Sequence, residues 1–174
     1  ITNNLIFLFY LVDDFCKGFE PWYKKSLLTC GAKKRNRKCK MSLSEIITIL
    51  IAFHQSGMAC FKYYYLELMR DYRNLFNYLV HYDRFVALIK LAFPALICLL
   101  KTLEGRVTEY LFIDATPMAV CHNLREKRHK VFKRLAKKGK TSTGWFFGFK
   151  LHLIFNTYGE IVRMQITGGN IEDR

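Results

Sequence analysis

The chain has 174 residues, of which 51% are hydrophobic and 16% aromatic, a composition that supports a packed core and argues against global disorder. Its 28 Lys and Arg residues against 14 Asp and Glu residues give a formal net charge of +14. Such an excess on a folded domain favours a polyanionic partner, with nucleic acid the first candidate and an anionic membrane surface the second.

Neither the cysteines nor the apolar runs point to secretion or to a membrane. None of the six cysteines forms a C-x-x-C pair or has zinc-finger spacing from a histidine pair, so we expect reduced thiols in the cytoplasm. The apolar run 5–12 lacks a basic leader, unlike a signal peptide. The run 85–100 contains Lys90 and Pro94 and is short for a bilayer, so we expect a buried helix pair or a kinked helix without a membrane.

The first hundred residues predict a helical module. Ser42 and Glu45 have the spacing of a capping box, and the run 46–53 that follows is apolar nearly all round, as in a buried helix. Two further helices are predicted over residues 61–70 and 83–101. The helices over 43–53 and 61–70 are compatible with a helix-turn-helix, but any two neighbouring helices match that description.

The second part of the chain predicts strands. Residues 110–113 form an apolar run that ends at Asp114, as a buried strand with a polar group at its tip would. Residues 145–155 alternate, residues 157–159 predict a turn, and 161–166 predict a returning antiparallel strand. We therefore expect an α+β or α/β protein, with a helical module for DNA binding or oligomerisation at 1–104 and a strand, basic loop and hairpin at 105–174.

The alternation in residues 145–155 separates two faces of the predicted strand. One face is apolar and carries Phe147, Phe149, Leu151, Leu153 and Phe155. The other carries Gly148, Lys150 and His152. We interpret Lys150 and His152 either as contacts to DNA or to the rim of an active site, or as the solvated face of the strand.

Two basic clusters are candidates for binding the phosphate backbone of a nucleic acid. The first places six cations within eight residues, and the alternative is a solvated loop: Lys33, Lys34, Arg35, Arg37, Lys38 and Lys40. The second has nine cations opposed only by Glu126, in the predicted loop after Asp114: Arg125, Lys127, Arg128, Lys130, Lys133, Arg134, Lys137, Lys138 and Lys140. A loop of this charge beside a carboxylate suits a substrate whose phosphate must reach a metal ion.

Asp114 is the candidate metal ligand. Two-metal phosphoryl transfer needs rigid, hard oxygen ligands, and a carboxylate at a strand end provides one. The alternative is that Asp114 caps a turn formed by the Thr116-Pro117 pair that follows it. One carboxylate does not decide between these hypotheses.

Several segments in order resemble insertion-sequence DDE transposases, most closely the family numbered nine-eighty-two. FIDATPMAVCH at 112–122 resembles the first acidic motif. The co-linear segments are DDFCK at 13–17, the basic cluster, SLSEI at 42–46, VFKRLAKKGKTS at 131–142, GWFFGFKLHL at 144–153 and GGNIEDR at 168–174. The similarity covers essentially the whole chain. It departs from the pattern at Ala115, where Ser is commoner, and at Gly168, where Pro is usual.

The resemblance implies a DNA transposase of a bacterial insertion sequence with an RNase H-like catalytic domain. It implies that Asp114 is the first catalytic Asp, that Mg²⁺ (or Mn²⁺) is the cofactor, and that a homodimer binds terminal inverted repeats and target DNA. The second Asp, on the fourth strand, and the final Glu are expected beyond Arg174. Asp173 is the alternative second Asp, unless it caps a following helix. The rival hypotheses are an RNase H-type nuclease and a non-catalytic, nucleic-acid-binding transposase remnant.

Overall fold

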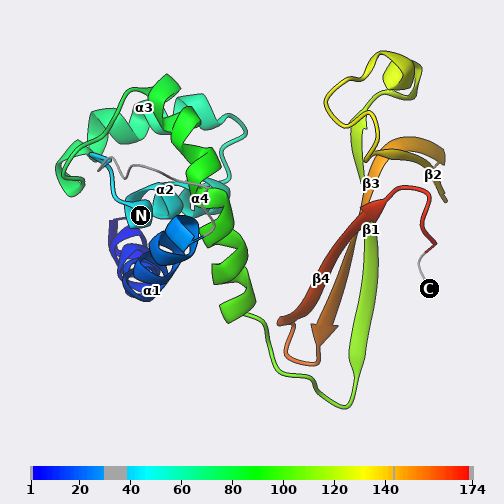
Figure 1. Ribbon diagram of the computed structural model, residues 1–174, viewed down its shortest axis with the longest axis horizontal. Helices are drawn as coiled ribbons and strands as arrows, with labels where there is room; N and C mark the ends of the chain where they lie inside the picture. Colours follow the sequence, from blue (N-terminus) through cyan, green and yellow to red (C-terminus); the bar gives the residue numbers. More distant parts are fainter. Residues whose placement is uncertain (1, 30–38, 143, 173–174) are drawn as a thin grey trace. The chain divides into compact units, whose positions relative to one another are not determined.

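The structure, a computed structural model, describes residues 2–29, 39–142 and 144–172. The chain divides into two compact units, Ile1–Lys101 and Thr102–Arg174, which Figure 1 shows as a helical part and a β part. The predicted boundary lay between residues 104 and 105. They are called the helical unit and the sheet unit here.

The helical unit contains the helices that the sequence predicts, together with a long first helix. Ser42 caps α2 as expected, because its Oγ accepts from the Glu45 N–H at 3.0 Å while Glu45 Oε2 accepts from the Ser42 N–H at 2.7 Å. Gly57, with a φ of +70°, follows the end of α2. The elements are α1 (Thr2–Thr29), α2 (Leu43–Gln55), α3 (Phe61–Asp71), a 3₁₀ turn (Arg73–Leu75) and α4 (Tyr82–Thr102).

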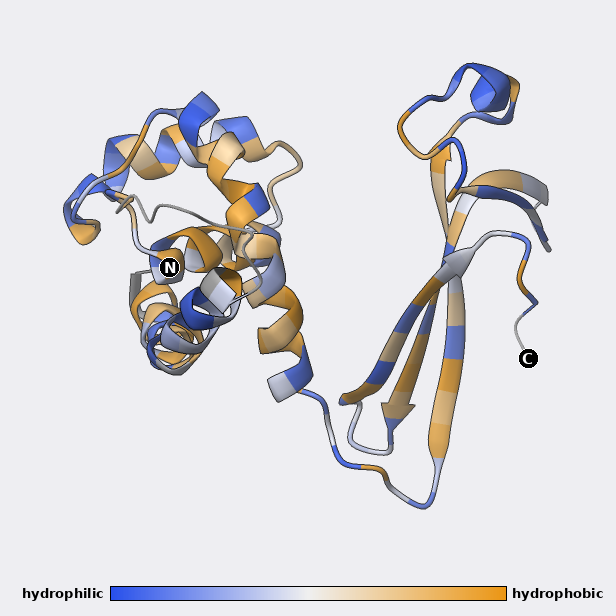
Figure 2. Cartoon of the chain, viewed as in Figure 1, coloured by the Kyte–Doolittle hydropathy of each residue, from blue (hydrophilic) through white to orange (hydrophobic). Residues whose placement is uncertain are grey.

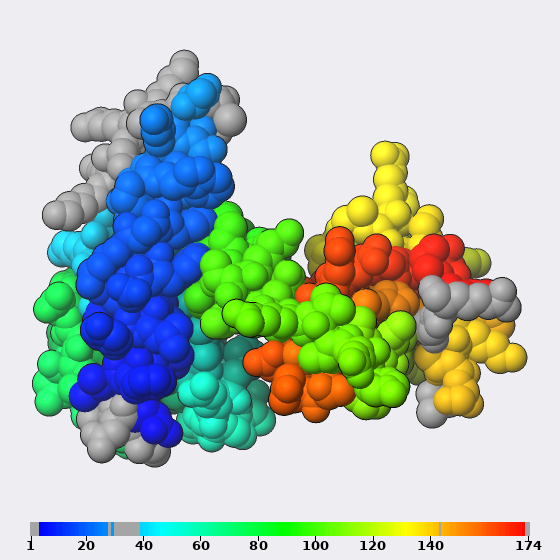
Figure 3. Space-filling model, turned by 90° about the horizontal axis from the view of Figure 1, so that it is seen from below, coloured from blue at the N-terminus to red at the C-terminus, as the bar shows by residue number. Residues whose placement is uncertain are grey.

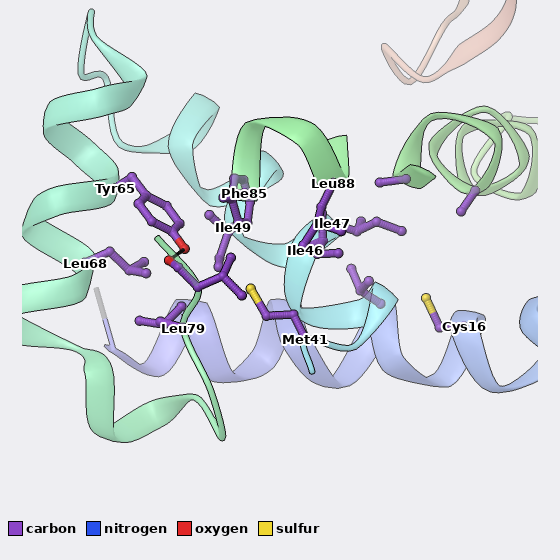
Figure 4. Close-up of a cluster of buried hydrophobic side chains, with 14 of the residues drawn as sticks. Cys16, Met41, Ile46, Ile47, Ile49, Tyr65, Leu68, Leu79, Phe85 and Leu88 are labelled. Carbon is purple, nitrogen blue, oxygen red and sulfur yellow. Dashed lines mark hydrogen bonds between the residues drawn. The ribbon is translucent and has the colours of Figure 1, made fainter. Parts of the chain in front are cut away.

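All four α-helices contribute to the core of the helical unit, and residues 44–49 of α2 are buried without a break, as predicted for a buried helix (Figure 4). Tyr65 of α3 is buried against Phe85 of α4, with ring centroids 4.7 Å apart, and its hydroxyl donates to the Val80 carbonyl at 2.6 Å. Cys16 of α1 lies in the same cluster, where burial, with smaller contributions from the Glu20 and Asp13 carboxylates, raises the pKa of its thiol to about 12. The five cysteines in the described residues are free.

Helix α4 is longer than the apolar run suggested. It spans 21 residues around Pro94 and is long and apolar enough, by length and composition alone, to cross a membrane. The expectation that this segment is too short was therefore wrong, although a core helix of a soluble protein passes the same test. One stripe of α4 lines the core of the helical unit: Phe85, Leu88, Ala92, Ala95 and Leu99.

The sheet unit is a four-stranded antiparallel sheet centred on its longest strand. Strand β3 pairs with β1 along one edge, while on its other edge β2 pairs with its first half and β4 with its second half. The predicted hairpin beside the Asp114 strand is thus confirmed. The elements are β1 (Leu111–Cys121), a 3₁₀ turn η2 (Asn123–Arg128), β2 (Lys137–Thr141), β3 (Gly144–Asn156) and β4 (Ile161–Gly168).

Two expectations about this sheet were wrong. Strand β1 is not a short buried strand ending at Asp114, because it continues to Cys121 and its residues are largely exposed. Phe112 and Ile113 are 61% and 72% exposed, since no α-helix of the described sheet unit beyond Thr102 covers them; Figure 2 shows this apolar stretch. Strand β2 was also missed, within the segment predicted to be a loop.

Asn156 organises the end of the sheet where β3 turns into β4. Its side chain is 1% exposed, and its Oδ1 accepts from the backbone N–H groups of Tyr158 and Glu160. Its Nδ2 donates to the Arg106 carbonyl at 3.1 Å and to Glu160 Oε2 at 2.7 Å. These four hydrogen bonds tie the turn and the segment that precedes β1 into one arrangement.

Candidate DNA-binding and metal-binding face of the sheet

The register of β3 with its neighbours decides which functional residues share a face. Side chains of directly paired strand residues point to the same side of a sheet. Asp114 pairs with Leu153 and Thr116 pairs with Leu151, and the bulge in β1 lies further along, at Ala119/Cys121. Asp114 therefore lies on the face formed by alternate residues of β3, called the Asp114 face here: Trp145, Phe147, Phe149, Leu151, Leu153 and Phe155.

The surroundings of Asp114 are open and mostly apolar. Its carboxylate is exposed, and one oxygen, Oδ2, accepts from the Thr116 hydroxyl at 3.2 Å. Across the sheet, Met164 of β4 pairs with Leu153 and is also exposed. Asp114 is the fourth residue of β1, and no turn follows it. The hypothesis that it caps a Thr-Pro turn is therefore wrong, because Pro117 is tolerated within an edge strand.

The Asp114 carboxylate has the chemistry of one ligand of a metal site. A carboxylate oxygen is the type of ligand that Mg²⁺ prefers. Residues 2–29, 39–142 and 144–172 contain no group of three His, Cys, Asp or Glu side chains placed to hold a metal ion. Asp173, the alternative second acidic residue, lies outside the described residues. The role of Asp114 as a metal ligand therefore stays a prediction.

The nine cations at 125–140, called the basic segment here, are all exposed. None of them forms a salt bridge within the part of the chain that the structure describes. Figure 3 shows atoms of this part of the chain, in yellow, standing out from the surface of the sheet unit. The segment is not simply a loop, because η2 holds its first cations and β2 its last three: Lys137, Lys138 and Lys140.

Two aromatic contacts attach the basic segment to the Asp114 face. The His129 ring packs edge-on against Phe147 at 6.1 Å, and the Phe132 ring packs edge-on against Phe149 at 5.4 Å. Phe149 precedes Leu153, the partner of Asp114, by four residues, which corresponds to about 13 Å along a strand. The structure therefore anchors the basic segment on the side of the sheet that carries Asp114. Lys138 and Lys140 lie on that side, whereas Lys137 pairs with Gly148 and lies on the other.

Lys150 and His152 lie on the opposite face of the sheet. Both alternate with the residues of the Asp114 face, and His152 Nε2 lies 2.8 Å from Thr167 Oγ1. This register disagrees with a position at the rim around Asp114. Lys150 is only 6% exposed, so the alternative of a solvated strand face is also wrong for this residue. Contact of either residue with DNA stays a prediction.

The other predicted DNA contacts belong to the helical unit. Lys33, Lys34, Arg35, Arg37 and Lys38 lie outside the described residues. Lys40 is exposed, with its Nζ 4.5 Å from the centroid of the Tyr78 ring. DNA binding by α2 and α3 as a helix-turn-helix stays a prediction.

Trp145 is a candidate site residue that the sequence analysis did not single out. It is 57% exposed at the start of β3, and the Nζ atoms of Lys138 and Lys140 lie 5.4 and 5.9 Å from its ring centroid. The sequence signal that could have identified this site is Lys-Gly-Lys at 138–140, because residues two apart in a strand lie on the same side. Recognising it required knowing that this cationic stretch is a strand.

The chain was compared with known proteins. No curated protein and no solved structure shows a significant match to it. Residues 104–174 match a family model described as a transposase DDE domain, and this range includes Asp114, the whole basic segment and Trp145. This part of the chain is therefore similar to a transposase DDE domain, and the match supports a DDE transposase.

Proposed function

We propose that the chain is part of a DNA transposase of a bacterial insertion sequence, in which the Asp114 face of the sheet receives DNA for cleavage and strand transfer. One observation carries the proposal: Asp114 and the attachment points of the basic segment, Phe147 and Phe149, lie on the same side of β3. The segment anchored on that side carries nine exposed cations, the charge that a phosphate backbone needs. Of its three cations in β2, Lys138 and Lys140 lie on that side, and Lys137 pairs with Gly148 on the other.

In this proposal Asp114 holds one position in a centre for Mg²⁺ or Mn²⁺. The metal ions, when bound, supply charge neutralisation of the phosphodiester and activation of the attacking oxygen. The Thr116 hydroxyl orients Asp114 by donating to Oδ2, which leaves Oδ1 for a ligand. The remaining acidic ligands are proposed to lie beyond Arg174, with Asp173 as the alternative second Asp.

The basic segment is proposed to fix the DNA relative to Asp114. Its cations bind phosphates, which determine the position and orientation of a duplex without reading its sequence. Two anchoring rings, His129 and Phe132, hold the segment on the sheet, so its charges keep a set position relative to Asp114. The helical unit is proposed to bind the ends of the element or a second protomer of a homodimer in the bacterial cytoplasm.

A binding and cleavage experiment separates this proposal from its rivals. The test uses the longer protein that includes the acidic residues proposed beyond Arg174. Its substrates are a labelled duplex with the element's terminal repeat, an unrelated duplex and an RNA–DNA hybrid, each with and without Mg²⁺. A transposase binds DNA in a salt-dependent manner, nicks the repeat end and joins it to target DNA. Degradation of the hybrid alone favours an RNase H-type nuclease. Binding without metal-dependent cleavage favours a non-catalytic remnant, and absence of DNA binding contradicts the proposal.

A further inference from the structure

The β2–β3 ribbon holds an exposed indole between two cations. Trp145 pairs directly with Lys140, and Lys138 occupies the diagonal position on the same face. Both Nζ atoms lie within 6 Å of the centroid of the indole ring, which is the range of a cation–π interaction. The side chain of Asn123 donates to the Trp145 carbonyl at 2.6 Å, which fixes the backbone of this residue.

This arrangement leaves the apolar surface of the Trp145 indole exposed, so the side chain adds little to the packing of the sheet unit. Phe147, two residues along β3 on the same face, is covered by the His129 ring and is 5% exposed, whereas Trp145 is left open at 57%. An indole has a larger apolar surface than most side chains, and covering it is favourable. A ligand with a flat ring would cover the exposed Trp145 indole, and negative charge on the same ligand would pair with the neighbouring lysines.

A nucleotide with an unpaired base combines these two features. Its base offers a π face to the indole and its phosphates offer negative charge to the lysines, and this combination is used by proteins that bind single strands. Inside a closed duplex both faces of each base are already stacked. An indole therefore gains such a contact only at an end, an opened region or a single strand.

We propose that Trp145, Lys138 and Lys140 form a binding site for an unpaired nucleotide of single-stranded or locally opened DNA. Trp145 stacks on the base, and the two lysines bind the flanking phosphates. The inference rests on the proposed function in taking DNA as the polyanion. It adds a preference for unpaired over paired DNA that the charge of the basic segment alone does not give.

The site is separate from the position of Asp114. Both lie on the Asp114 face, but Trp145 precedes Leu153, the partner of Asp114, by eight residues along β3. At about 3.3 Å per residue the two positions are roughly 26 Å apart along the strand. Trp145 is therefore proposed to contact DNA away from the phosphodiester that Asp114 serves.

The test uses fluorescence of the full chain, which contains two tryptophans. Trp22→Phe removes the indole of α1 and leaves Trp145 as the sole indole fluorophore. Single-stranded dT12 and a 12-base-pair duplex with closed ends are titrated at equal ionic strength. Binding of dT12 is expected to quench the Trp145 emission by more than half, and the closed duplex is expected to bind with little quenching.

Affinity measurements supply the second readout. Trp145→Ala is expected to weaken dT12 binding by roughly five- to 150-fold, the effect of losing one stacked base, and to leave closed-duplex binding within about twofold. Trp145→Phe should retain most of the affinity, and Trp22→Ala, the matched control in the helical unit, should have no effect. Far-UV circular dichroism of each variant checks folding, and Trp145→Phe keeps the test valid if Trp145→Ala does not fold.

Three results would overturn the inference while leaving the proposed function intact. They are equal loss of dT12 and duplex binding in Trp145→Ala, unquenched Trp145 emission on saturation with dT12, and tighter binding of U12 RNA than of dT12. If the unaltered chain binds neither dT12 nor duplex, the proposed function itself fails.

Discussion

Removing cations of the basic segment one at a time should lower the salt dependence of DNA binding in equal steps. The series is Arg128→Gln, then the addition of Lys127→Gln, then the addition of Lys133→Gln. All three side chains are exposed, and none forms a salt bridge within the described residues. Their replacement should therefore change the free energy of unfolding by no more than about 0.5 kcal/mol each.

The size of each step follows from counterion release. A cation that neutralises one phosphate of a duplex contributes about 0.9 to the slope of log K against log salt concentration. The complete series should therefore reduce the slope by about 2.7, which corresponds to roughly 40-fold less loss of affinity between 50 and 200 mM salt. Fluorescence anisotropy of a labelled duplex, titrated at four or five salt concentrations, measures the slope directly.

Arg163→Gln provides the matched control. Arg163 is an exposed cation of the same sheet unit, but it pairs with Ile154 and so lies on the face opposite Asp114. Its replacement removes the same charge and should leave the slope within the error of the measurement. An unchanged slope across the series, or an equal change with Arg163→Gln, would refute the assignment of DNA binding to the Asp114 face.

Three further predictions concern stability and reactivity. Asn156→Asp replaces the amide that donates to Glu160 Oε2 by a carboxylate oxygen in a buried site. It should therefore lower the free energy of unfolding, measured in urea at pH 7, by about 2–4 kcal/mol. A loss below about 1 kcal/mol would contradict the role of this network. The hydrogen bond from Lys17 lowers the pKa of Asp13 in the folded chain. The Asp13 carboxylate therefore stabilises the fold at pH values above its pKa in the unfolded chain, and this stabilisation is lost as the pH falls through the lowered pKa. Asp13→Asn should accordingly flatten the decline of melting temperature in acid. Burial raises the pKa of Cys16 to about 12, so its thiol should resist iodoacetamide at pH 8 in the folded chain and react in urea, and rapid native labelling would disagree with its place in the core.

The elements that the sequence predicts well are those with strong local patterns. The capping box of Ser42 and strand β3 were both predicted from residues close in sequence, and both are present. Burial along β3 does not follow the predicted alternation, since Lys150 is buried and Leu151 and Leu153 are only half-buried. Strand β2 has no apolar alternation, and it forms because β3 supplies a partner. A Cβ on its Gly139 would lie 2.0 Å from the Gly169 carbonyl oxygen, so the absence of a side chain lets β2 lie beside the end of β4.

The candidate site was predictable only in part. The residue types in it can be read from short stretches of sequence, but their positions relative to one another depend on pairing between strands that are distant in sequence. Asp114 and the basic segment are visible in the sequence, but their common face depends on the register between β1 and β3. A shift of one residue would have put Asp114 on the side of Lys150 and His152. The bounds of β1 were predicted incorrectly because Pro117 suggests a turn, whereas an edge strand accepts a residue without an N–H donor.

The central claim is that Asp114 is a metal ligand for phosphodiester cleavage. The most direct test is Mg²⁺-dependent nicking of a terminal-repeat duplex by Asp114→Asn, in the longer protein that includes the acidic residues proposed beyond Arg174. Asn preserves the shape of the side chain and removes the charge that holds the metal ion. The account predicts that nicking is abolished while duplex affinity and melting temperature stay close to those of the unaltered protein. Retained nicking by Asp114→Asn would contradict it.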